Sequence, residues 1–226
     1  PAIISGAFAI VCVLYWLWTS TARPPKDDLR EAGLGLRLPT YASGPDSVGW
    51  WAMWITMLGD ATAFASLIFG FFFYWTARPD FPPAGADHAI GVWVVAAGVL
   101  LVAAWASTVA AREANSRGRI IIARTALLVA PILALAGAAA AYMAVRQMDP
   151  TSHVYPAIMW ALMIWLVAHV LAGVIMQGYC LAGSVWGKLT DKYDADLRNV
   201  TLYWHFMALK AVTTAVILGL VPGWLS

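Results

Sequence analysis

Charged side chains are scarce in this chain. Asp, Glu, Lys and Arg together make up 12% of its 226 residues, whereas soluble domains average about 25%. Apolar residues account for 62%. So few charges cannot cover a water-soluble domain of this size, and most of the surface must therefore face lipid or other apolar protein. The net charge is only +2, which provides no electrostatic basis for binding nucleic acid.

Residues that hold metals or act as nucleophiles are also few. Cys12 and Cys180 lie far apart in apolar runs, at no metal-ligand spacing, so we expect two buried free thiols. The four histidines show no ligand spacing within one helix, whereas a haem needs facing axial histidines and a copper site needs clustered ligands. The sequence has no Cys-x-x-Cys, no Gly-rich phosphate loop and no nucleophile elbow. We therefore expect no catalytic centre, metal or cofactor in this chain.

Long apolar runs are abundant instead. About six of them are long enough to cross a bilayer, which takes about 20 residues each. They cover residues 2–19, 50–75, 90–111, 120–145, 154–181 and 200–225. The first run lacks a basic segment before it and a cleavage site after it, which indicates a membrane span rather than a signal peptide. The predicted fold is all-α, a polytopic membrane bundle of about six transmembrane helices.

Proline and small residues suggest how these spans are joined and packed. Residues 20–47 are rich in proline, glycine and charge, which predicts a linker outside the bundle. Pro131 and Pro156 fall within predicted spans, where neighbouring groups can absorb a kink. Residues 134–141 read ALAGAAAA, and such small side chains allow close approach of helix backbones.

The basic residues alternate between connections. Residues 20–47, 112–119 and 184–199 are rich in Lys and Arg, whereas the connections between them carry only Arg78 and Arg146. The positive-inside rule therefore places the three basic segments in the cytoplasm and both termini outside. Several aromatic residues near the predicted span ends are expected to form interfacial belts: Trp50, Trp51, Tyr74, Trp75, Tyr203 and Trp204.

Three ionisable residues, Asp60, His169 and Lys210, lie deep within predicted spans. At 1.5 Å per residue, Asp60 and Lys210 lie roughly 15 Å from the cytoplasmic ends and His169 roughly 18–21 Å. An unpaired charge there costs about 2.5–3.5 kcal/mol. We therefore expect an Asp60–Lys210 pair with His169 as a hydrogen-bonding neighbour. A structural clamp is the favoured role and a proton relay the alternative, while His205, nearer the interface, is expected to bond a loop rather than a metal.

Three segments also carry recognisable patterns. Residues 48–75 (VGWWAMWITMLGDATAFASLIFGFFFYW) begin with paired tryptophans and hold an acid, Asp60, midway. Residues 153–173 (HVYPAIMWALMIWLVAHVLAG) run from a His-x-Tyr entry to His-Val-Leu-x-Gly. Residues 199–206 (NVTLYWHF) contain Tyr-Trp-His-Phe. In this order the patterns resemble three helices of haem–copper oxidase subunit III, and the resemblance covers residues 45–226.

The chain departs from that family's pattern at two places. The family usually continues Tyr-Trp-His-Phe with Val-Asp, where this chain has Met207 and Ala208, followed by Lys210. Leu166 stands where the family often has a histidine three residues before His169. An Asp60–Lys210 pair would be a replacement for the family's own arrangement.

The resemblance also implies a domain organisation. Residues 48–226 look like the five-helix form of subunit III, which lacks the first two of seven helices. Residues 1–19 resemble the last helix of subunit I, as in bacterial oxidases in which subunit I is fused to subunit III. Residues 20–47 would then be a cytoplasmic linker. The chain begins at Pro1 without methionine, which suggests trimming, processing or the tail of a longer polypeptide, and the resemblance to a fused subunit I/III implies the last of these.

The function implied by the resemblance is that of a non-redox part of an aerobic terminal oxidase. Such a subunit stabilises subunit I and supports proton uptake, while the complex passes electrons from cytochrome c to oxygen and pumps protons. Oxidase subunits I and II would be the partners and would carry the haem and copper. Bound phospholipid is expected, with Trp50, Trp51 and Trp54 as candidates for a lipid cleft. The location implied is the bacterial inner membrane, with both termini periplasmic.

Two alternatives remain. An accessory subunit of a quinol oxidase or nitric-oxide reductase would show the same motifs, because the donor site lies on other subunits. An ion or solute carrier using Asp60 and Lys210 is less favoured, because carriers commonly show internal repeats and broken helices, and neither is evident here.

Overall fold

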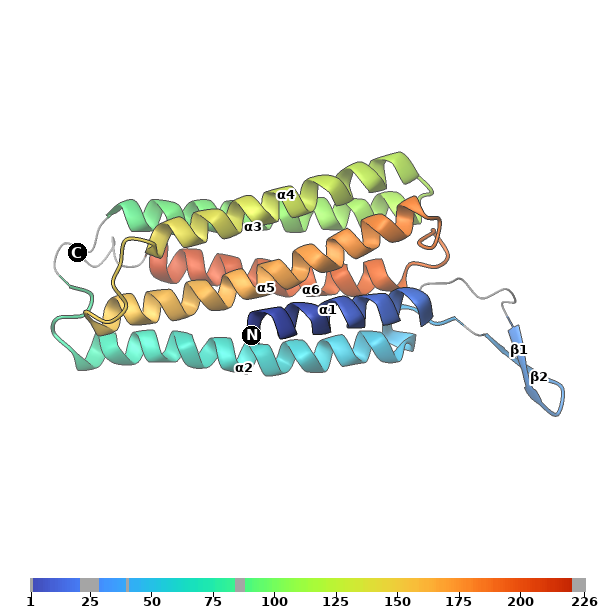
Figure 1. The fold of residues 1–226 in the computed structure, drawn as a ribbon, viewed down its shortest axis with the longest axis horizontal. Coiled ribbons are helices and arrows are strands. Elements are labelled where there is room, and N and C mark those ends of the chain that lie inside the picture. Colours follow the sequence, from blue (N-terminus) through green and yellow to red (C-terminus); the bar gives the residue numbers. More distant parts are fainter. Residues whose placement is uncertain (1, 21–28, 40, 84–87, 221–226) are drawn as a thin grey trace.

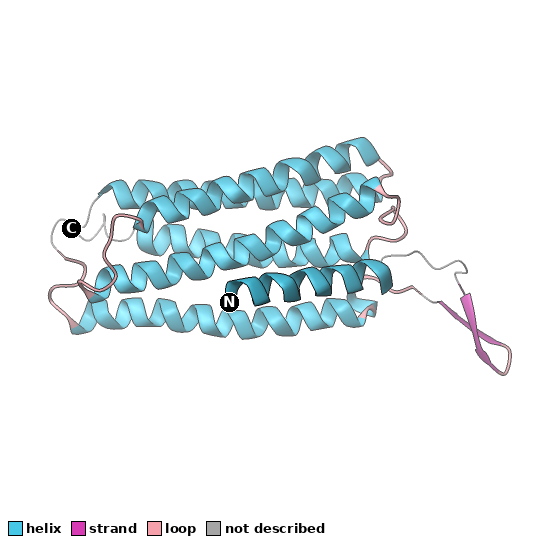
Figure 2. Cartoon of the chain, in the orientation of Figure 1, coloured by secondary structure: helices cyan, strands magenta, loops and turns pink. Residues whose placement is uncertain are grey.

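Long apolar helices make up most of the chain (Figures 1 and 2). The computed structural model describes residues 2–20, 29–39, 41–83 and 88–220. Its elements, in order, are α1 (Ala2–Ser20), β1 (Leu29–Gly33), β2 (Leu36–Pro39), the 3-10 turn η1 (Gly44–Asp46), α2 (Val48–Ala77), α3 (His88–Ser116), α4 (Ile120–Val145), α5 (Val154–Val185), α6 (Ala195–Thr214) and the π-helical segment η2 (Ala215–Leu220).

The predicted all-α membrane bundle is confirmed. Five helical segments are long and apolar enough to cross a membrane, namely Val48–Ala77, Ile90–Ser116, Ile120–Val145, Val154–Val185 and Ala195–Gly219. The apolar part of α1, Ile4–Thr19, is shorter. The hydropathy pattern therefore located each of these five spans. The predicted and observed spans differ in the residues at which they begin and end.

Successive helices of the bundle run in opposite directions (Figure 1). The α2–α3 and α4–α5 connections lie at one end. The α3–α4 and α5–α6 connections and the start of α2 lie at the other, where α1 also ends. The described parts of the three basic segments thus share one end of the bundle; which face of the membrane that end meets remains a prediction.

Two of the helix starts show how local sequence sets the boundaries. Ser47 caps α2, and its side chain accepts a hydrogen bond from the Trp50 amide. His153 caps α5, and its Nδ1 accepts from the Tyr155 amide at 3.1 Å. Pro156 consequently falls in the first turn of α5, where a missing N–H costs no intrahelical bond.

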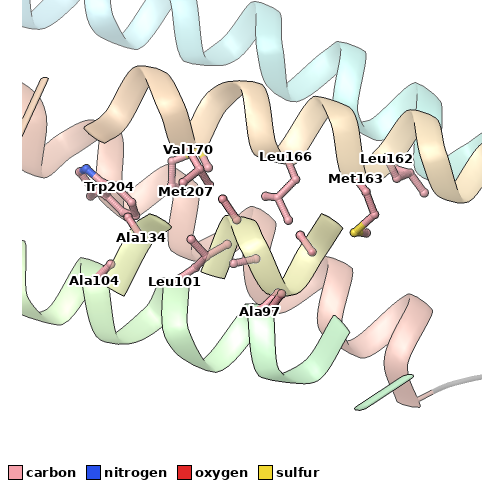
Figure 3. Close-up of a cluster of buried hydrophobic side chains, with 14 of the residues drawn as sticks. Ala97, Leu101, Ala104, Ala134, Leu162, Met163, Leu166, Val170, Trp204 and Met207 are labelled. Carbon is pink, nitrogen blue, oxygen red and sulfur yellow. The ribbon is translucent and has the colours of Figure 1, made fainter. Parts of the chain in front are cut away.

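Small residues bring α3 and α4 close together, as predicted. A Cβ added at Gly137 would lie 2.9 Å from the Leu101 side chain, so no larger residue fits there without movement. Figure 3 shows the resulting core, in which side chains from α3, α4, α5 and α6 converge. Its buried members include Leu101, Ala134, Leu166 and Trp204.

The expectations for Tyr203, Trp204 and Cys12 were wrong. Tyr203 and Trp204 do not belong to an interfacial belt, because α6 starts at Ala195 rather than at residue 200 and they lie deeper, 9% and 0% exposed. The polar first turn of α6 concealed that start from a hydropathy reading. Cys180 is a buried free thiol, but Cys12 is free and exposed on α1.

The segment 20–47 contains a β-hairpin that the sequence analysis did not predict. Strands β1 and β2 pair antiparallel, and the hairpin projects beyond the end of the bundle (Figure 1). Leu34 occupies its tip with φ +51°, between Gly33 and Gly35, which also have positive φ. Two glycines around one residue are the signal that could have located this turn.

Candidate functional site

The candidate site is a carboxylate held between three helices. Asp60 of α2 faces Lys210 of α6, whose Nζ donates to Asp60 Oδ2 at 2.7 Å. His169 of α5 places Nε2 3.0 Å from the other oxygen, Asp60 Oδ1. The structure thus brings together all three of the deep ionisable residues singled out in the sequence. Their nearly equal depth in three different spans explains why they meet.

A fourth side chain completes the shell around the carboxylate. The indole N–H of Trp165, one turn before His169 on α5, donates to Asp60 Oδ1 at 2.9 Å. Asp60 therefore accepts hydrogen bonds from α5 and α6 at once. Trp165 was not predicted, and its i, i+4 spacing from His169 is the signal that could have placed both on one helix face.

Both ring nitrogens of His169 have polar partners. Nδ1 of His169 is 2.7 Å from the Trp165 carbonyl oxygen, which only accepts, so Nδ1 carries a proton. Nε2 of His169 lies 3.0 Å from Asp60 Oδ1, close enough for a proton to lie between them.

Lys210 lies in an aromatic enclosure. Its side chain is 1% exposed, and its Nζ lies 5.3 Å from the centre of the Phe64 ring and 5.2 Å from that of Phe206. Both distances are within the range of cation–π attraction. The aromatic faces and the Asp60 carboxylate together make this buried position tolerable for an ammonium group.

Exposure differs across the cluster. The Asp60 side chain is 11% exposed and that of His169 24%, so the imidazole is the more exposed of the two groups. Tyr203 of α6 donates its hydroxyl to the His169 carbonyl oxygen at 2.7 Å and ties α6 to α5 beside the site. It belongs to the Tyr-Trp-His-Phe pattern, but its role here was missed because it was assigned to the interfacial belt.

His205 was expected to bond a loop, and that expectation was wrong. Its Nδ1 accepts a hydrogen bond from the indole N–H of Trp105, on α3, at 2.6 Å. His205 therefore joins two helices outside the Asp60 cluster. The earlier start of α6 again accounts for the error, because it moves His205 away from the connecting segment.

The tryptophans proposed for a lipid cleft lie together at the start of α2. The rings of Trp50 and Trp51 are 5.1 Å apart and those of Trp50 and Trp54 5.8 Å, both edge to face. Trp51 is 56% and Trp54 45% exposed. Trp51 also donates its indole N–H to the Pro45 carbonyl, which attaches the segment before α2 to the helix. The lipid-binding role stays a prediction.

A second His–Asp pair lies at the other end of the bundle. His153 Nε2 is 3.0 Å from Asp80 Oδ2 and joins the α2–α3 connection to the start of α5. Because His153 Nδ1 accepts the Tyr155 amide, Nε2 carries the proton and a neutral imidazole satisfies both bonds. This hydrogen bond lowers the pKa of Asp80 below its ordinary value of 3.8.

Within the described ranges, no group of three or more His, Cys, Asp and Glu side chains gathers as metal ligands. The Asp60 site itself offers a single carboxylate, whose oxygens lie against nitrogen groups of Trp165, His169 and Lys210. Comparison with protein-family models and with curated protein sequences finds no match for this chain.

Proposed function

We propose that this chain is a subunit III-like, non-redox part of an aerobic terminal oxidase in a bacterial inner membrane, with its termini on the periplasmic side. In this role it stabilises the catalytic subunit and supports proton uptake into it. The complex would reduce oxygen with electrons from cytochrome c and would pump protons. Its haem and copper would reside in subunits I and II.

One observation carries the proposal. Each of the three segments that resemble subunit III contributes to a single site, because Asp60, His169 and Tyr203 come from the first, second and third of them. Unrelated apolar helices have no reason to place their family-like residues at one point. Lys210 lies just beyond the third pattern and supplies the counter-charge.

The residues of the site have distinct roles in this proposal. Asp60 and His169 share a proton and can pass it by switching between an acid–imidazole and a carboxylate–imidazolium form. Lys210 favours the carboxylate through a charge-assisted hydrogen bond. Trp165 fixes the carboxyl oxygen that faces the imidazole. The site would thus buffer protons beside the entry to a catalytic subunit.

The test is purification through a tag on this chain in mild detergent, followed by a reduced-minus-oxidised spectrum and mass spectrometry of co-purifying subunits. Haem a or haem b bands together with a copper-site subunit would support the proposal. Oxidation assays with cytochrome c and with quinol then separate it from a quinol oxidase. A colourless preparation running alone overturns it and brings forward a carrier that uses Asp60 and Lys210.

The proposed role in proton uptake is tested with a substitution at Asp60. Asp60→Asn in the purified complex is expected to retain the haem spectrum and to lower proton uptake per electron. Asp80→Asn, at the opposite end of the bundle, is the matched control and should leave uptake unchanged. Unchanged uptake in an assembled Asp60→Asn complex would leave only a structural clamp.

A further inference from the structure

A pocket opens between the start of α3 and the end of α4, away from the Asp60 site. Its volume is about 300 Å³, at the lower end for ligand sites. Its lining comes from α3, α4 and the turn after α4: Ile90, Trp93, Met143, Ala144, Arg146, Gln147 and Met148. One side is thus apolar and aromatic, and the other carries a guanidinium and an amide.

The turn that supplies the polar side is held in place from α5. The indole N–H of Trp160 donates to the Met148 carbonyl at 3.0 Å, and the Trp160 ring contacts Tyr142 edge to face at 6.2 Å. The Arg146 amide continues the α4 hydrogen bonding by donating to the Tyr142 carbonyl. The pocket is therefore built on a fixed backbone.

Arg146 is the basic group of this pocket. Arg78, in the other connection at this end, pairs with Asp80 at 3.2 Å. Arg146, by contrast, forms no ion pair with any residue that the structure describes. A guanidinium presents planar, paired donors that match a phosphate. The positive charge of Arg146 therefore favours binding of an anion.

The apolar side determines which kind of anion. The pocket lies where membrane-spanning segments end, and Trp93, 41% exposed, is the residue type that prefers the headgroup level of a bilayer. Ile90 and Met143 add further apolar side chains to the lining. Free phosphate would gain nothing from this wall, whereas a phospholipid would use both sides.

The geometry points to a binding site for one anionic phospholipid, such as phosphatidylglycerol, in the α3–α4 pocket. Arg146 and Gln147 hold its phosphate, and its acyl chains begin along Ile90, Trp93 and Met143. This site is independent of the proposed oxidase function. It also lies at the end of the bundle opposite the Trp50–Trp51–Trp54 cluster.

The test is native mass spectrometry of the full chain in nonionic detergent with added phosphatidylglycerol or phosphatidylcholine of identical acyl chains. Wild type should retain the anionic lipid preferentially. Arg146→Gln should weaken phosphatidylglycerol binding about five- to tenfold, as expected for one lost charge-assisted contact, and leave phosphatidylcholine unchanged. Arg78→Gln, the other arginine at this end, is the matched control and should bind both lipids like wild type.

Three results would overturn the inference: equal retention of the two lipids by wild type, undiminished phosphatidylglycerol binding by Arg146→Gln, or an equal loss in Arg78→Gln. Competition by inorganic phosphate separates the two sources of the anion. Phosphate that displaces the lipid at equal concentration would show that the apolar wall contributes nothing. Trp93→Ala gives a second reading, because it should weaken lipid binding while Arg146 remains.

Discussion

Among single residues, Asp60 stands out because three polar side chains surround its carboxyl group. Its carboxyl group accepts hydrogen bonds from an indole and an ammonium, and an imidazole lies 3.0 Å away; the three groups come from two other helices. Each partner satisfies a lone pair that lipid could not. The same shell makes Asp60 hard to replace, because removing it leaves three polar groups facing one another.

Breaking the Asp60–Lys210 pair from either side should destabilise the bundle. Asp60→Asn or Lys210→Met alone is expected to lower the free energy of unfolding by about 3–5 kcal/mol, because a buried charge loses its partner. The double variant should cost less than the sum of the two by at least about 1 kcal/mol, since the groups are in direct contact. Denaturant titration in mixed micelles measures each value.

A strictly additive double variant would contradict this coupling. The control is Lys188→Met. Lys188 follows the end of α5, and its ammonium lies over the ring of Trp18 on α1, away from the Asp60 site. Combining it with Asp60→Asn should give additive costs, since the two positions share no partner.

Between elements, Gly173 of α5 lies directly against two aromatic side chains of α6. A Cβ there would lie 2.9 Å from Trp204 Cζ2 and 3.1 Å from Tyr203 Cε1. Gly173→Ala should therefore destabilise the protein by about 1–3 kcal/mol through overpacking. Gly178→Ala, on the same helix with nothing within 4 Å, should be neutral or gain up to about 1 kcal/mol of helix propensity. Thermal unfolding in nonionic detergent compares them, and equal effects would refute the contact.

The Asp80–His153 bond links two connections and should respond to acid. Because folding lowers the pKa of Asp80 below 3.8, its contribution is present above that pH and is lost as the pH falls through the folded value. Asp80→Asn should lower the melting temperature slightly near neutral pH. The difference from wild type should shrink below about pH 4. A difference independent of pH would assign the effect to something other than this carboxylate.

The sequence predicted the helices and the Asp60 cluster better than it predicted helix boundaries and the role of Trp165. Long apolar runs located the five spans, because lipid leaves a helix few alternatives. Charged residues at similar depth likewise predicted that Asp60, His169 and Lys210 meet. Hydropathy failed at the start of α6, where polar residues continue the helix into water. It could not predict Trp165 as a donor either, because that role depends on the rotation of α5 about its axis.

For the whole molecule, the arrangement of connections sets a testable orientation. The described parts of the three basic segments share one end (Figure 1), and the positive-inside rule places that end in the cytoplasm. In a Cys12→Ser background, Pro150→Cys should react with a membrane-impermeant maleimide added to intact cells. Ser116→Cys should react only after the cells are opened. The reverse pattern would invert the predicted orientation.

Helix α1 is attached to the bundle differently from the other helices. Near its end, Trp18 contacts Tyr179 and Trp186 edge to face, and the Lys188 ammonium lies 3.4 Å from the centre of the Trp18 ring. Further back, an apolar groove of about 370 Å³ lies between α1 and α5. In evolutionary terms, a helix that packs on the outside of α5 can be gained or lost by gene fusion or fission without redesign of the core. We expect relatives of this chain to differ first in whether α1 is encoded in the same gene as the five-helix bundle.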